Sequence, residues 1–152
     1  MNDLDNALKV QILLVEDNPG DVVLFMEALD ETHVRSNLST VEDGEEALAF
    51  LRREGRHKYA PRPHLIILDL NLPKLNGREV LQEIRNDSHF NVIPVVILTT
   101  SKSEKDMLEA YRLHASCYIV KPVDLKNFIS VLKQVTHFWL NVARLPMGNQ
   151  ES

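Results

Sequence analysis

Short apolar runs alternate along this chain with longer amphipathic segments, and that alternation restricts the possible folds more than any other feature. The apolar runs, which have the length of strands, are Gln11–Val15, Asn37–Val41, Leu65–Leu68, Ile93–Leu98 and Cys117–Val120. The segments with helical spacing are Asp21–Asp30, Glu45–Glu54, Arg78–Asn86, Lys105–His114 and a last one from Asp124 to about Ala143. Near-continuous valine, isoleucine and leucine indicate strands that are buried on both faces. We therefore expect an α/β protein in which five strand–helix repeats form a parallel sheet covered by helices.

Length and composition limit what such a protein can do. A chain of 152 residues is long enough for one domain with its own core. The net charge of −5 argues against general nucleic-acid binding, because phosphate contacts need a basic face. A single cysteine, Cys117, excludes an internal disulfide and favours the cytoplasm, and no apolar run has the ~20 residues that span a membrane. We expect one domain over residues 10–145, between terminal tails at 1–9 and 146–152.

Polar residues follow the apolar runs at the points where the predicted strands end. Glu16 and Asp17 follow the first strand, Asp69 the third, Thr99 the fourth and Lys121 the fifth. Because the carboxyl ends of parallel strands lie along one edge of a sheet, these side chains should share one crevice. Neighbouring carboxylates repel one another unless a cation neutralises them, and ligands that are all oxygen suit Mg²⁺. The pattern predicts a Mg²⁺-dependent phosphoryl site, with Lys121 as the counter-charge for phosphate.

Within this site Asp69 is the best candidate nucleophile, because a buried strand fixes its position. Asn71, two residues later, can lend its backbone carbonyl to the metal. Asp17 is the better direct ligand, and Glu16 is the longer outer partner. Taken singly, strand-end acids are commonly helix caps, and a lysine before proline is usually solvated. The prediction depends on all five polar positions lying at the same edge.

Five motifs in this order resemble the receiver domain of two-component response regulators. They are Leu14-Val15-Glu16-Asp17, Leu68-Asp69-Leu70-Asn71-Leu72-Pro73, Gly77, Leu98-Thr99-Thr100 and Tyr118-Ile119-Val120-Lys121-Pro122. The resemblance extends from about Val10 to about Val135. The loop Arg56–Pro63 and the ending His137-Phe138-Trp139-Leu140 look most like the stand-alone receivers that partner cyanobacterial phytochromes.

The resemblance implies a flavodoxin-like (βα)5 fold, a doubly wound five-stranded parallel sheet with strand order 2-1-3-4-5. It also implies that Asp69 accepts a phosphoryl group from a histidine kinase, with Mg²⁺ held by Asp17, Asp69 and the backbone carbonyl of Asn71. Glu16, which replaces the commoner aspartate, would act on the metal through water. Thr99 and Lys121 would bind phosphoryl oxygens.

The resemblance assigns further roles around this pocket. Tyr118 would be the aromatic switch that moves inward when Thr99 is engaged, and the Lys121–Pro122 peptide bond would be cis. Asn71 and Ser101 would tune dephosphorylation, and the small, uncharged Ser101 predicts an intermediate phosphoryl lifetime. Such a protein is a signalling receiver that catalyses only its own phosphorylation and dephosphorylation, not an enzyme in the usual sense.

The output of the domain should be a contact with another protein, because we recognise no second domain. The last helix carries more apolar residues than one face needs, and Val131, Phe138, Trp139 and Val142 widen its surface. We expect a homodimer contact there; the alternative is that this end folds back on its own domain. Val22 and Val23 are a second candidate surface, for the kinase, although one of them can simply be core.

Two other functions remain open at this point. A phosphorelay shuttle would pass phosphate on to a histidine phosphotransfer protein, and the sequence does not separate this from a terminal switch. A haloacid-dehalogenase-like phosphotransferase also uses a strand-end aspartate with Mg²⁺. It needs a second aspartate two residues later, where this chain has Asn71.

Overall fold

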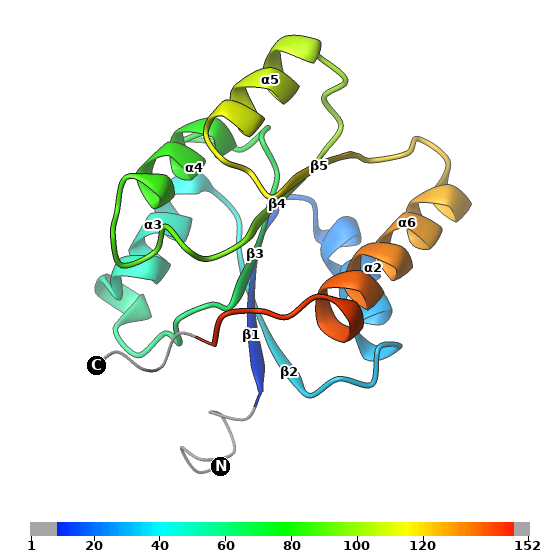
Figure 1. Cartoon of the computed structure of the whole chain (residues 1–152), viewed down its shortest axis with the longest axis horizontal. Helices are drawn as coiled ribbons and strands as arrows, with labels where there is room; N and C mark the ends of the chain where they lie inside the picture. Colours follow the sequence, from blue (N-terminus) through cyan, green and yellow to red (C-terminus); the bar gives the residue numbers. More distant parts are fainter. Residues whose placement is uncertain (1–8, 148–152) are drawn as a thin grey trace.

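A computed structural model describes residues 9–147, in which strands and helices alternate (Figure 1). The strands are β1 (Val10–Val15), β2 (Ser36–Val41), β3 (Leu65–Leu68), β4 (Val95–Thr99) and β5 (Cys117–Val120). The helices are α2 (Pro19–Asp30), α3 (Gly44–Arg52), α4 (Gly77–Arg85), α5 (Glu104–Arg112) and α6 (Leu125–His137). A 3₁₀ turn, η1 (Gly55–His57), follows α3, and a π-helical segment, η2 (Phe138–Val142), continues α6. Most of the expected tails, residues 1–8 and 148–152, lies outside the described residues.

The five strands form one parallel sheet in the order β2-β1-β3-β4-β5, which confirms the predicted fold class and strand order. Val15 at the end of β1 stands opposite both Val41 on β2 and Leu68 on β3. Thr99 at the end of β4 stands opposite Val120 on β5. The residues that follow these positions therefore emerge at one edge of the sheet. This edge contains the switch point between β1 and β3, where open α/β sheets bind their ligands.

Each face of the sheet has its own apolar core. Helices α3, α4 and α5 cover one face, and α2 and α6 cover the other (Figure 1). Along β3, Ile66 and Leu68 point to the first core, and Leu65 and Ile67 to the second. All four side chains are at least 99% buried, so neither face of β3 reaches solvent. Burial on both faces is what the uninterrupted apolar runs predict.

Side-chain caps fix where the helices begin. Asn18 accepts hydrogen bonds from the backbone N–H groups of Gly20 and Asp21, so α2 begins at Pro19 rather than at the expected Asp21. Asp43 caps α3 in the same way, and Asn76 and Glu79 form a reciprocal capping box on α4. Pro19 can stand in the first turn of α2, because a backbone N–H at that position would have no partner within the helix.

Two sequence expectations in this region need correction. Strand β4 begins at Val95 rather than Ile93, because Pro94 has no N–H to donate to the ladder, although its carbonyl accepts from Ile66. The Lys121–Pro122 bond is trans, as are the other peptide bonds between residues 9 and 147, so the cis prediction is wrong. The trans isomer is favoured intrinsically by about 0.5–1 kcal/mol, and Lys121 reaches its partners without the cis form.

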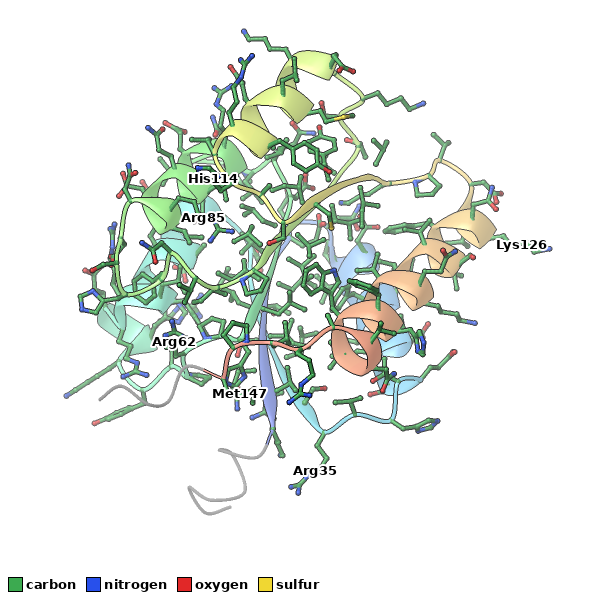
Figure 2. All side chains as sticks on the ribbon, viewed as in Figure 1. Arg35, Arg62, Arg85, His114, Lys126 and Met147 are labelled. Atoms are coloured by element: carbon green, nitrogen blue, oxygen red, sulfur yellow. The ribbon has the colours of Figure 1, made fainter. Side chains whose placement is uncertain are left out.

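The chain beyond α6 crosses back toward the sheet. Helix α6 and η2 together end at Val142, close to the expected Ala143, and Trp139, Leu140 and Leu145 pack against the core of the α2–α6 face. Figure 2 places Met147 near the end of the sheet where the strands begin, on the same side as Arg62. Across residues 9–147 we find no helix with the length and apolarity needed to cross a membrane.

Candidate functional site

The polar residues at the strand ends meet in one place, as the sequence predicts. Glu16, Asp17 and Asp69 each offer a carboxylate oxygen, and these oxygens lie within 4.8 Å of one another. Glu16 and Asp69 are buried, whereas Asp17 is exposed at the mouth of the site. Two carboxylates are thus held by the sheet and the third faces the approach from solvent.

Lys121 stands at the centre of this carboxylate group. Its Nζ atom donates hydrogen bonds to Oε1 of Glu16 at 2.6 Å and to Oδ2 of Asp69 at 3.1 Å. A third hydrogen bond, of 2.9 Å, reaches Oδ2 of Asp21 in the first turn of α2. The expected counter-charge for phosphate is therefore shared among three carboxylates.

Burial and shared hydrogen bonds shift the pKa values of Glu16 and Lys121. Burial raises the pKa of Glu16 to about 7, although hydrogen bonding to Lys121 acts in the opposite direction. Burial acts to lower the pKa of Lys121, but hydrogen bonds to Glu16 and Asp21 outweigh it and hold the pKa above its ordinary value. Lys121 is therefore charged at neutral pH, and Glu16 takes up a proton more readily than an ordinary glutamate.

The donor set fits a hard divalent cation. Glu16, Asp17 and Asp69 provide only oxygen ligands, and their combined charge exceeds what one ammonium group can balance. Oxygen ligands in this number suit Mg²⁺ or a similar ion better than a metal that prefers nitrogen or sulfur. The geometry of the three carboxylates can accept such a cation at the mouth of the crevice.

Backbone hydrogen bonds and close packing against α4 fix the position of Asp69. Its Oδ1 accepts a hydrogen bond from the backbone N–H of Asn71 at 3.0 Å, and its own backbone N–H donates to Val15. Gly77 at the start of α4 packs against it, and a Cβ there would lie 2.2 Å from the carbonyl oxygen of Asp69. The glycine permits α4 to begin directly against the site.

The hydroxyl of Thr99 lies on the β4 side of the crevice. It accepts hydrogen bonds from the backbone N–H of Ser101 at 3.3 Å and from Nδ2 of Asn71 at 3.4 Å. Ser101 in turn donates to Asp106 on α5 at 2.6 Å. The hydroxyl of Tyr118 donates to the carbonyl of Ser101 at 3.0 Å, and its ring packs against the α3–α5 core. Thr99, Ser101 and Tyr118 are thus joined through one loop.

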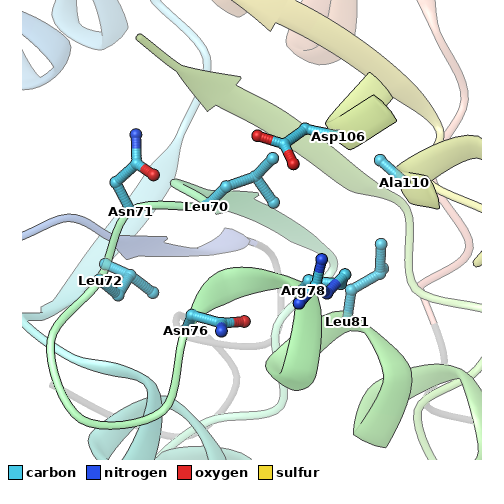
Figure 3. A pocket seen from close by; sticks show the side chains of 8 residues that line it. All are labelled: Leu70, Asn71, Leu72, Asn76, Arg78, Leu81, Asp106 and Ala110. Atoms are coloured by element: carbon cyan, nitrogen blue, oxygen red, sulfur yellow. The ribbon is translucent and has the colours of Figure 1, made fainter. Parts of the chain in front are cut away.

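A cavity of about 280 Å³ opens beside the site rather than over its carboxylates. Figure 3 shows its lining side chains, which come from the loop after β3, from α4 and from α5. At its mouth Arg78 on α4 forms an ion pair of 2.6 Å with Glu109 on α5. Asn71 borders both this cavity and Thr99, so the loop after β3 separates the two spaces.

Sequence reasoning missed Asp21 as a member of this site. An acidic residue in the first turn of a helix is ordinary, because it complements the positive end of the helix dipole. A usable signal was its position four residues after Asp17, on a helix that begins at the crevice. Of the expected surface valines, Val22 packs against the α2–α6 core and Val23 is exposed.

Comparison with known proteins gives relatives that match nearly the whole chain. A family model described as the response regulator receiver domain matches residues 12–133. The response regulator Rcp1 of Synechocystis sp. is 44% identical over 146 residues, which cover 96% of this chain and 99% of the relative. The probable methanogenesis regulatory protein FilR2 of Methanothrix harundinacea is 38% identical over 136 residues, covering 89% and 86%.

Solved structures agree with these matches. A crystal structure of the Mn²⁺-bound form of Rcp1 has a TM-score of 0.88 at 44% identity and covers 90% of this chain and 99% of its own. The phosphorylated cyanobacterial phytochrome response regulator RcpA has a TM-score of 0.87 at 48% identity, covering 91% and 99%. The family model includes every strand end that contributes to the site, and this protein therefore belongs to the response regulator receiver domain family.

Proposed function

We propose that this protein is a single-domain response regulator that accepts a phosphoryl group on Asp69 from a histidine kinase. The observation that carries this proposal is the position of Asp69, between a group of carboxylates suited to a divalent cation and the ammonium group of Lys121. Such a site can offset the charge that builds up when a carboxylate attacks an anionic phosphoryl group.

In the transfer step a carboxylate oxygen of Asp69 forms a bond to phosphorus while the phosphorus–nitrogen bond of the kinase phosphohistidine breaks. The bonding electron pair stays on the histidine nitrogen, and the ring, which carries a proton on its other nitrogen, leaves as neutral imidazole. The Asp69 carboxylate has no proton to lose, so no general base is required there. Mg²⁺, held by Asp17, Asp69 and the carbonyl of Asn71 with Glu16 acting through water, would neutralise phosphoryl charge. Lys121 and the hydroxyl of Thr99 donate hydrogen bonds to phosphoryl oxygens, which draws Thr99 inward and allows Tyr118 to follow.

The kinase partner that we propose is of the phytochrome type, working in the cytoplasm. Support comes from the similarity to RcpA, which is a cyanobacterial phytochrome response regulator. The exposed side chains of Val23 and Met26 on α2 provide an apolar surface on the helix that begins at the crevice, where a kinase must approach Asp69. The acidic charge of the chain supports a protein partner rather than nucleic acid.

We further propose that the output surface is a homodimer contact formed by β5, α6 and η2. A groove of about 650 Å³ between these elements is lined mainly by apolar side chains, including Val131 and Trp139. Phe138 on its rim is 48% exposed, and Val142 on the same segment is 57% exposed. A groove beside a protruding aromatic ring suits a twofold contact in which each Phe138 enters the groove of the other copy.

Phosphotransfer profiling tests the proposed function. Purified histidine kinases that carry radioactive phosphate are mixed with wild type, Asp69→Asn and a control, Asp30→Asn, in the presence of Mg²⁺. Wild type and Asp30→Asn should take label from a phytochrome-type kinase within minutes, and Asp69→Asn should take none. Absence of label on wild type from every kinase, or equal label on Asp69→Asn, would overturn the proposal.

A further inference from the structure

The ammonium group of Lys121 has no spare donor in this structure. A lysine carries three N–H donors, and those of Lys121 reach Glu16 at 2.6 Å, Asp21 at 2.9 Å and Asp69 at 3.1 Å. A phosphoryl oxygen can receive a hydrogen bond from Lys121 only if one of these carboxylates gives up its own. The identity of that carboxylate decides how readily the site accepts an anion.

Asp21 is the partner best placed to yield. Its side chain is 20% exposed, whereas those of Glu16 and Asp69 are 3% and 7% exposed, so water can take over its hydrogen bonds at little cost. Asp69 cannot leave, because it would carry the phosphoryl group itself. Glu16 has the shortest hydrogen bond to Lys121 and also belongs to the group of carboxylates suited to a metal.

We propose that Asp21 is a positioning residue that holds Lys121 in the resting site and competes with the phosphoryl group for its ammonium. This inference rests on the proposed function of Asp69 and adds a residue to it. Asp21 acts on both ions that the site would take. Its charge adds to the negative field that attracts a divalent cation, and its hold on Lys121 opposes an anion.

Asp21→Asn should therefore change the affinities for Mg²⁺ and for a phosphoryl analogue in opposite directions. Loss of one negative charge should weaken Mg²⁺ binding roughly three- to tenfold, as measured by titration calorimetry. Release of Lys121 should strengthen the binding of beryllofluoride at saturating Mg²⁺ by roughly the same factor, as measured by NMR titration. A merely structural role, such as support for the first turn of α2, would weaken both affinities together.

Two further variants serve as controls. Asp21→Glu keeps the charge and should retain a Mg²⁺ affinity within about twofold of wild type. Asp30→Asn removes an equivalent charge from the last residue of α2, at the opposite end of this helix from Asp21. It should leave both affinities unchanged. Thermal unfolding of each variant confirms that it is folded under the titration conditions.

The outcomes separate this inference from the function on which it rests. Opposite shifts in Asp21→Asn support the role of Asp21, whereas unchanged affinities or shifts in the same direction overturn it. If wild-type protein itself neither binds beryllofluoride nor takes phosphate on Asp69, the proposed function fails instead.

Discussion

Lys121 and Glu16 form a buried ion pair of 2.6 Å although 105 residues separate them in the chain. The pair joins the carboxyl end of β5, the outermost strand on its side of the sheet, to the carboxyl end of β1, which lies between β2 and β3. Because both side chains are more than 90% buried, removing one partner leaves an uncompensated charge in a medium that solvates it poorly. The pair therefore links the stability of the fold to the charge of the functional site.

Replacement of Lys121 by methionine should destabilise the metal-free protein by about 3 kcal/mol, because four carboxylates then lie together without a cation. Saturating Mg²⁺ should recover a large part of this loss, since it supplies positive charge to the same carboxylates. Urea unfolding with and without Mg²⁺ measures both effects.

Lys133→Met is the matched control, because Lys133 pairs with Glu31 on the exposed surface. This variant should change the free energy of unfolding by less than about 0.5 kcal/mol. Equal losses in the two variants would contradict the prediction.

Gly77→Ala should damage both the fold and the site. Alanine normally stabilises a helix relative to glycine by about 1 kcal/mol, but here its Cβ would overlap the carbonyl oxygen of Asp69. We expect a loss of about 2 kcal/mol or more in urea unfolding and slower phosphorylation, because the backbone that carries Asp69 must shift. Gly20→Ala, whose Cβ would meet only the side chain of Asn18 at 3.2 Å, should stay within about 1 kcal/mol of wild type and be phosphorylated normally.

Much of the site could be predicted because it depends on local pattern and on one rule of topology. Apolar runs give the strands, and the two shortest, Leu65–Leu68 and Cys117–Val120, match the structure residue for residue. In a parallel sheet the residues after each strand emerge at one edge, so Asp69 and Lys121 were expected at the same edge once the strands were recognised. The 3.1 Å hydrogen bond between them spans β4, which lies between their strands.

What could not be predicted depends on contacts between distant segments. Asp21 is an ordinary first-turn acid until Lys121 arrives from the far end of the chain. The isomer of the Lys121–Pro122 bond depends on the surrounding packing, because the intrinsic preference between isomers is small. His64 is one of six histidines scattered along the sequence, and only pairing of β1 with the start of β3 gives it its partner Gln11.

His64 should make stability depend on pH. Its Nδ1 accepts a hydrogen bond from the backbone N–H of Gln11, which requires the neutral ring, and burial lowers the pKa of His64 below its ordinary value of 6.5. The unfolded chain therefore binds the proton more readily, so the contribution of His64 is complete above pH 6.5 and is lost as the pH falls below it. A hydrogen bond to the backbone of Met147 acts to raise this pKa but is outweighed by burial, and the charge of Arg62 acts in the same direction as burial.

The measurement is urea unfolding at about pH 8 and about pH 5.5. His64→Asn keeps a neutral acceptor for Gln11 and should lose less stability than wild type between these conditions. His33→Asn, at an exposed position, is the control and should follow wild type. A His64→Asn protein with the same pH dependence as wild type would exclude this role.

The lifetime of the phosphorylated protein should be intermediate, with a half-life between the extremes of seconds and many hours. Asn71 and Ser101 border the approach to Asp69, and neither carries a charge that would activate water. Because the Ser101 hydroxyl already donates to Asp106, Ser101→Ala should change the hydrolysis rate by less than about threefold. Loss of label from purified, kinase-free phosphoprotein gives this rate, and a wild-type half-life at either extreme would contradict the assignment.

The surface formed by β5, α6 and η2 should hold two copies together. Phe138 is half exposed on the rim of the groove, so Phe138→Ser should abolish the dimer while leaving the thermal stability of the monomer nearly unchanged. Val92→Ser, at a position that is exposed outside the groove, should leave the dimer intact. Sedimentation at micromolar concentration measures the association. Trp139, the one tryptophan of the chain, lines the groove together with Cys117, so its fluorescence should change with association. A wild-type protein that is monomeric both with and without phosphate on Asp69 would rule out this contact.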